Sequence, residues 1–218
     1  MNNHPLKISI IATAAQQSTN QTVIAGVARQ ASNLKPITST ALQYLLATIF
    51  LFLITSSINA KSYMTQEEFL QLTVKQLSIE TDFKTKTLWL NKELQKQIKD
   101  ILNHNYPKLR LRYKISLNER IPTTVWYLDE IGKERPISFG VSIKEETIQL
   151  IRVLEFRESR GYEIEALPFA EQFNNARLNE DRKLNKNIDG ITGATMSVSA
   201  MKKISRVALF LHQFVLKE

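Results

Sequence analysis

The sequence contains no cysteine, and its 218 residues include only three histidines. Without cysteine the chain can form no disulfide framework, no catalytic thiolate and no thiolate metal site. The histidines, His4, His104 and His212, are too far apart along the chain to indicate a histidine-rich metal site. The absence of cysteine is compatible with either compartment and suits an oxidising one outside the cytoplasm. A hydrophobic content of 43% and a charged content of 23% are typical of a globular protein.

The first sixty residues contain no acidic residue, although they carry three basic ones. An apolar run, Ala41–Ile54, follows the basic segment, and a polar stretch then ends at Ala60. This order is typical of a secretory signal peptide. Extended to Ile58, the apolar run has 18 residues, which is close to the lower limit for a membrane-spanning helix. We therefore predict that residues 1–60 are a leader that contains a signal peptide or a membrane anchor.

Residues 61–104 are predicted to form a helical N-terminal part. Thr65 and Glu68 have the spacing of a capping box, and apolar residues follow at helical intervals, so a helix is expected over 65–78. A second helix should begin after Asn91, a good N-cap residue. It should end before Tyr106-Pro107, because the residue before a proline disfavours the helical conformation.

Residues 105–218 are predicted to form an α+β domain, a β-meander followed by a helix. Four successive segments are predicted to be strands. Apolar and polar residues alternate at 109–115 and 137–143, residues 123–129 are rich in β-branched and aromatic types, and residues 148–156 follow a polar turn. Short connections between them indicate an antiparallel β-meander sheet, with helices packed before and after it. The fourth segment is mainly apolar, so we expect it to be central. After Thr195 an amphipathic pattern predicts a C-terminal helix.

The part beyond the leader, residues 61–218, has 26 basic and 21 acidic residues, which are interspersed. Nucleic-acid binding would require a clustered basic face with aromatic residues for stacking, and the sequence indicates none. We therefore expect a solvated charged surface that includes Lys202, Lys203 and Arg206. Trp89 and Trp126 are assigned to core packing.

The segment Ile188–Ser199 carries the strongest functional signal. Gly193 and Ala194 are small enough to let a ligand or another backbone approach closely. Thr195 stands at the expected start of the last helix, where unpaired N–H groups and the helix dipole favour an anion. From the residues alone, simple helix capping by Thr192, Thr195 or Ser197 is the alternative, so all three hydroxyls are candidate site residues.

Residues 189–195, Asp-Gly-Ile-Thr-Gly-Ala-Thr, match at every position the flavinylation motif Asp-x-x-[Ser/Thr]-Gly-Ala-[Ser/Thr]. The chain thereby resembles the FMN-binding domain family, which includes covalently flavinylated domains of the Rnf complex and of the sodium-pumping NADH:quinone reductase. The resemblance implies an FMN covalently bound through its phosphate to Thr195. It implies that Asp189 is a recognition or activating residue for a separate flavin transferase, which takes FMN from FAD with a magnesium ion. Gly193 and Ala194 would keep the loop thin enough to enter that enzyme.

A weaker likeness lies in the loop that follows the fourth predicted strand. The ion-pumping members have Glu-Thr-Pro-Gly-x-Gly in this place, near the bound flavin. The present chain keeps Glu158 and Gly161 but has Ser159 and Arg160 where the motif has Thr and Pro. This departure weakens any implication of sodium pumping and makes the chain more similar to single-domain periplasmic members. Glu158 is expected either to contact FMN or to pair with Arg160 on the surface.

The resemblance covers roughly residues 105–212 and implies an exported flavoprotein that transfers electrons in a membrane-linked redox chain. The electron donor would be a membrane redox partner, such as a flavocytochrome or a quinone-linked reductase. The sequence shows no Gly-x-Gly-x-x-Gly motif for a nicotinamide nucleotide and no constellation for acid–base or nucleophilic catalysis, which favours a carrier over a stand-alone enzyme. Two alternatives stay open: an FMN-dependent reductase acting directly on a small substrate, and an unmodified interaction module.

Overall fold

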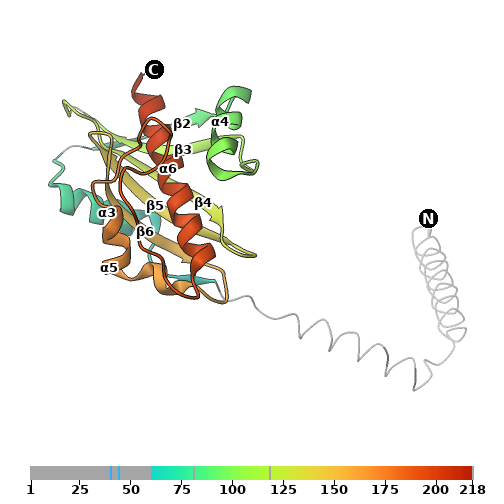
Figure 1. Ribbon diagram of the computed structural model, residues 1–218. Helices are drawn as coiled ribbons and strands as arrows, with labels where there is room; N and C mark the ends of the chain where they lie inside the picture. The colour runs from blue at the N-terminus through green and yellow to red at the C-terminus, as the bar shows by residue number, and fades with distance from the viewer. Residues whose placement is uncertain (1–39, 41–43, 45–59, 81, 118, 218) are drawn as a thin grey trace, which may run out of the picture. The chain divides into compact units, whose positions relative to one another are not determined.

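A computed structural model describes residues 60–80, 82–117 and 119–217, together with Thr40 and Tyr44 (Figure 1). Its strands are β1 (Lys61–Ser62), β2 (Phe83–Trp89), β3 (Arg110–Ser116), β4 (Thr124–Ile131), β5 (Pro136–Lys144) and β6 (Thr147–Phe156). Its helices are α3 (Gln66–Leu77), α4 (Lys92–Leu102), α5 (Leu167–Ala170) and α6 (Thr195–Lys217), with 3-10 turns η1 (Tyr162–Glu165) and η2 (Glu171–Phe173). The predicted signal peptide or membrane anchor lies outside the described residues. Within those residues, no helix has the length and apolar character needed to span a bilayer.

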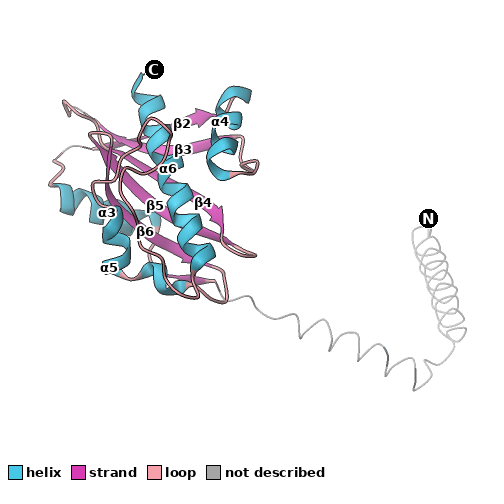
Figure 2. Ribbon diagram, in the orientation of Figure 1, coloured by secondary structure: helices cyan, strands magenta, loops and turns pink. Residues whose placement is uncertain are grey.

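The strands form one six-stranded antiparallel sheet in the order β1-β6-β5-β4-β3-β2 (Figure 2). The predicted α+β class and the meander β3-β4-β5-β6 are confirmed. Strand β6 is not central, because its outer neighbour is the two-residue strand β1. It is apolar because helices cover both of its faces: Leu150 and Leu154 pack in the same cluster as Phe69 of α3, whereas Ile151 and Val153 belong to the core under α6.

Strand β2 lies inside the segment 61–104 that was predicted to be helical, and the sequence analysis missed it. Its seven residues, Phe-Lys-Thr-Lys-Thr-Leu-Trp, are rich in strand-forming types, but only Leu88 is buried. An edge strand with one buried residue does not show the apolar alternation by which strands are recognised. The same position explains Trp89, which was assigned to packing and is instead 66% exposed at the strand end.

The two helices predicted between 65 and 106 are confirmed, together with their caps. Thr65 Oγ1 accepts a bond from the Glu68 backbone N–H at 3.1 Å, and Glu68 Oε2 accepts one from the Thr65 backbone N–H at 2.7 Å. Asn91 Oδ1 accepts a bond from the Leu94 backbone N–H at 2.9 Å. Helix α4 ends at Leu102, before the proline. The capping signals in the sequence thus locate both helices.

Helix α6 crosses one face of the sheet and completes the main core (Figure 2). Under it, Trp126 of β4 is fully buried, as predicted, and its ring stacks on Tyr113 at 4.5 Å between ring centroids. The Trp126 indole N–H donates to Thr124 Oγ1 at 2.9 Å. Thr124 Oγ1 in turn lies 2.7 Å from Nδ1 of His212, whose other ring nitrogen has no protein partner. A polar relay therefore joins β4 to α6 inside the core.

Burial lowers the pKa of His212 to about 4, from 6.5 in an unfolded chain. Between those two pH values the unfolded chain binds a proton that the folded chain does not, so the free energy of unfolding falls as the pH falls. The full loss is about 3 kcal/mol at 1.36 kcal/mol per pKa unit. We expect urea unfolding to show this loss between pH 6.5 and pH 4.

A His212→Gln variant supplies the control, because its side chain keeps a hydrogen-bonding group and does not titrate. His104 acts in the opposite direction: its hydrogen bond to Glu130 raises its pKa, so its stabilisation is present below pH 6.5 and declines as the pH rises. The pH slope should therefore be measured as the difference between wild type and the His212 variant. An unchanged slope in His212→Gln would show that His212 does not titrate in this way.

Candidate functional site

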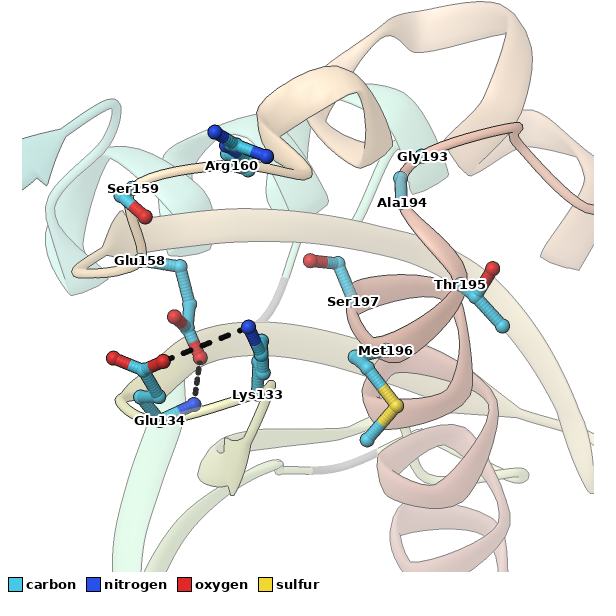
Figure 3. Close-up of a pocket in the computed structure, with 10 residues that line it drawn as sticks. All are labelled: Lys133, Glu134, Glu158, Ser159, Arg160, Gly193, Ala194, Thr195, Met196 and Ser197. Carbon is cyan, nitrogen blue, oxygen red and sulfur yellow. Dashed lines mark hydrogen bonds and ion pairs between the residues drawn. The ribbon is translucent and has the colours of Figure 1, made fainter.

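A cavity of about 470 Å³ lies between the hairpin that joins β4 to β5, the loop after β6 and the first turn of α6. Figure 3 shows its walls: Lys133 and Glu134 from the hairpin, residues 158–160 from the loop, and residues 193–197 at the start of α6. The two segments that the sequence analysis selected, separated by more than thirty residues, thus line the same cavity.

Gly161 holds the loop against the start of α6. Its φ of +89° is a conformation that favours glycine. A Cβ at this position would lie 2.3 Å from Ser197 Oγ and 3.6 Å from the Cα atom of Ala194. A side chain at position 161 would therefore displace the Ser197 hydroxyl or the loop, and the positive φ would strain it in either case, so the close approach of the two segments favours glycine.

The first turn of α6 begins without a side-chain cap. The backbone N–H of Ala194 bonds to Ile191 O at 3.0 Å, and the first helical bond runs from Val198 N–H to Ala194 O at 2.9 Å. In the part of the chain that the structure describes, no hydroxyl of Thr192, Thr195 or Ser197 accepts a bond from this turn, so the simple capping alternative is wrong. The N–H groups of residues 195–197 thus remain for an anion.

Thr195 is exposed, whereas Ser197 is buried, although both line the cavity. In Figure 3 the Ser197 hydroxyl points toward the 158–159 loop, and the Thr195 side chain lies on the other side of the helix. Thr195 is therefore the hydroxyl of the two that a second protein can reach.

The cavity wall has an unpaired positive charge. Lys133 Nζ lies 3.7 Å from Glu134 Oε1. Arg160 is exposed and has no ion-pair partner among the described residues. A guanidinium group and a helix N-terminus on one cavity both favour a phosphate.

Residues 132–209 match the family model described as the FMN-binding domain. This segment resembles that family. The match confirms the resemblance inferred from the flavinylation motif and supports FMN as the ligand of this segment. It begins at the β4–β5 hairpin and includes all the residues that line the cavity. A comparison with curated proteins finds no match.

The cavity in the matched segment suits a phosphate-bearing cofactor. Its volume of about 470 Å³ lies within the range of roughly 300–1,000 Å³ for small-molecule sites. Arg160 and the α6 N–H groups offer charge and donors to a phosphate, and Met196, 51% exposed, offers an apolar surface. The residues present therefore fit FMN.

Glu158 does not pair with Arg160, and that expectation is wrong. Its Oε1 accepts bonds from the backbone N–H groups of Glu134 at 2.6 Å and Arg135 at 2.8 Å. The carboxylate thereby ties the loop after β6 to the β4–β5 hairpin and fixes two walls of the cavity relative to each other. Contact between Glu158 and FMN stays a prediction.

Asp189 and Thr192 lie outside the cavity lining, and both are exposed. The backbone N–H of Asp189 donates to Gln172 Oε1 at 2.8 Å, so its segment is held while its carboxylate faces solvent. Gly193 has a φ of +85° and would have no atom within 4 Å of an added Cβ. The motif thus has one end in the cavity, at residues 193–195, and the other on the surface.

Three residues that the sequence analysis placed on a solvated face instead make polar contacts that hold neighbouring segments to α6. Lys202 Nζ donates to Ile188 O at 2.6 Å, directly before the motif. Lys203 Nζ lies 3.4 Å from the buried carboxylate of Glu130. Arg206 Nε donates to Arg182 O at 2.6 Å, and burial lowers its pKa. The spacing of the three residues along the helix is that of a solvent-exposed face. Their partners come from segments distant in the sequence that the fold brings next to α6.

The sequence analysis missed Lys133, Glu134 and Met196. The hairpin residues carry a turn signal and nothing that indicates a binding site. Met196 could have been inferred, because it follows Thr195 at a helix start.

Proposed function

We propose that the chain is an exported flavoprotein that carries FMN in a phosphoester bond to Thr195 and transfers electrons in a membrane-linked redox chain. The observation that carries this proposal is the position of Thr195. This residue is exposed, begins α6, lines the cavity and is the last residue of the flavinylation motif. The match to the FMN-binding domain supports the cofactor.

We propose that attachment needs a second protein, a proposal supported by the exposure of Thr195, whose hydroxyl forms no hydrogen bond with a side chain among the described residues. We propose a flavin transferase that uses FAD and magnesium. The Thr195 oxygen forms a bond to the phosphorus on the riboflavin side of FAD, the phosphoanhydride bond breaks, AMP leaves, and the hydroxyl loses its proton. Asp189, exposed six residues before Thr195, is the side chain proposed for recognition by that enzyme.

After attachment, the residues of the chain hold and orient the cofactor. FMN supplies the redox chemistry of its isoalloxazine ring. Arg160 and the N–H groups at the start of α6 stabilise the negative phosphate. The bond to Thr195 prevents loss of the cofactor by diffusion, which would matter outside the cytoplasm. A membrane redox partner, such as a flavocytochrome or a quinone-linked reductase, is the proposed electron donor.

The proposal is tested by the intact mass of the chain after co-expression with a flavin transferase. The protein should gain the mass of one FMN less one water and should fluoresce in a denaturing gel. A chain that never gains this mass is an unmodified module. A labelled chain that oxidises or reduces a small substrate without a protein partner would support the reductase alternative.

Export is expected to depend on the leader, because a basic segment without acidic residues precedes the apolar run. A reporter enzyme that is active only outside the cytoplasm should work when it is fused after Lys61. Replacing two residues of the run, Leu51 and Leu53, with arginine should remove most of that activity, whereas arginine at the polar positions Ser18 and Ser32 should not. Equal activity in both variants would contradict export through this run.

A further inference from the structure

Strand β3 presents a row of cations on one face of the sheet. Arg110, Arg112 and Lys114 occupy alternate positions of β3, and alternate side chains of a strand point to the same face. Lys108 precedes the strand by two residues and lines the same cavity as Arg110 and Arg112. We call these four residues the basic stripe. Arg110 and Arg112 are exposed, whereas Leu111 and Tyr113 between them are buried in the core under α6. The sequence analysis expected no clustered basic face, and the strand produces one.

Only one cation of the basic stripe is neutralised. Lys108 Nζ lies 2.6 Å from Asp129 Oδ2. Among the described residues, the other three have no ion-pair partner. The Arg110 guanidinium lies 5.8 Å from the centroid of the Trp89 ring, which is 66% exposed. Neighbouring cations on one strand face lie about 7 Å apart and repel each other, so the row is unfavourable for the isolated chain.

The basic stripe lines a groove beside the start of α3. Two adjacent cavities, of about 170 and 300 Å³, share Gln66, Arg112 and Tyr127. The first is also lined by Lys114, and the second by Lys108 and Arg110. The Tyr127 hydroxyl donates to Gln66 O at 2.9 Å and joins the sheet to the helix. None of the residues of this groove lines the FMN cavity.

The acidic groups around the groove do not balance its charge. Asp129 is engaged by Lys108, and Ser138 also donates to it, at 2.6 Å. Glu67, at the start of α3, is near enough that its charge, after burial, contributes to the raised pKa of Tyr127. Glu67 accepts a hydrogen bond from Gln71 Nε2 at 3.1 Å and, among the described residues, forms no ion pair with the cations of the stripe.

We propose that this groove binds an acidic segment of a partner protein. Guanidinium groups bind carboxylates through paired hydrogen bonds, and a row of them fits a segment with acidic residues at intervals. A concave site favours a protruding peptide segment over the flat surface of a membrane. The exposed Trp89 beside Arg110 adds an aromatic group of the kind enriched at protein interfaces. This inference needs no flavin, so its failure would leave the proposed function intact.

The test is the binding of a fluorescein-labelled ten-residue peptide of alternating Glu and Ser to the full chain, followed by fluorescence anisotropy. The Arg112→Gln, Lys114→Gln double variant should bind about tenfold more weakly, since each exposed ion pair contributes up to about 1 kcal/mol. Raising the salt from low to physiological concentration should weaken wild-type binding. The variant should unfold at the same or a higher urea concentration, because it loses like-charge repulsion.

The matched control is Lys96→Gln, Lys99→Gln, which removes the same net charge from the exposed face of α4. It should bind the peptide like wild type. Equal weakening in both double variants would reduce the effect to net charge and overturn the proposal. Absence of peptide binding would also overturn it, as would tighter stripe-dependent binding to phosphatidylglycerol vesicles or to oligothymidylate, which would assign the groove to a membrane or to nucleic acid.

Discussion

Replacement of Thr195 by alanine is expected to abolish covalent flavin labelling completely. The variant lacks the Thr195 hydroxyl oxygen, which is exposed in the cavity wall and is the proposed acceptor, so no phosphoester can form at this position. After co-expression with a flavin transferase, wild type should show the added mass of one FMN less one water, and the variant should show none. The fold should survive, because Thr195 is exposed and its hydroxyl makes no cap to α6.

Two neighbouring hydroxyls provide controls for that result. Thr195→Ser keeps an oxygen at the same position and should retain labelling. Ser197→Ala removes a buried hydroxyl that a transferase cannot reach, so its labelling should stay close to that of wild type. Thr192→Ala, on the exposed part of the motif, should slow the reaction without eliminating it. Label that persists on Thr195→Ala would move the acceptor to Thr192 or Ser197.

The elements of the fold that could be predicted are those whose signals are local. The capping residues Thr65 and Asn91 locate α3 and α4. The residue patterns of the four predicted segments locate the strands of the meander. Strand β2 was missed because its partners are supplied by β3, and its own sequence buries only Leu88. The order of strands beyond the meander depends on contacts between distant segments, which no local pattern records.

The candidate site was predicted in part for the same reason. The motif and Gly161 could be found because they resemble sequence motifs of the FMN-binding domain family. The fold brings residues 193–195 of the motif and the loop that contains Gly161 together at one cavity. Lys133 and Glu134 line the cavity because the fold places the hairpin between β4 and β5 beside the 158–160 loop. The role of Glu158 could not be predicted either, since its partners are backbone N–H groups on a hairpin more than twenty residues away.

Gly161→Ala is expected to lower the free energy of unfolding by about 1–3 kcal/mol through backbone strain, with a further loss from its clash with Ser197. The added Cβ would lie 2.3 Å from Ser197 Oγ and 3.2 Å from Ser197 Cβ, so the Ser197 side chain or the 158–160 loop must shift, and we expect the shape of the cavity to change. Urea unfolding of the unlabelled chain measures the first effect. Quenching of free FMN fluorescence by the apo-protein measures the second, and the variant should quench more weakly than wild type.

Two other glycines separate strain from contact. Gly193 also has a positive φ, of +85°, but an added Cβ there would meet open space, so Gly193→Ala should show the strain alone. Gly190 has neither feature, and Gly190→Ala should leave stability within about 0.5 kcal/mol of wild type. The double variant Gly161→Ala, Ser197→Ala should recover the contact part of the loss, because the atom at 2.3 Å is then absent and Ser197 Cβ, at 3.2 Å, becomes the nearest. If Gly161→Ala were no more destabilising than Gly193→Ala, the loop and α6 would not be in the close contact that forms the FMN cavity.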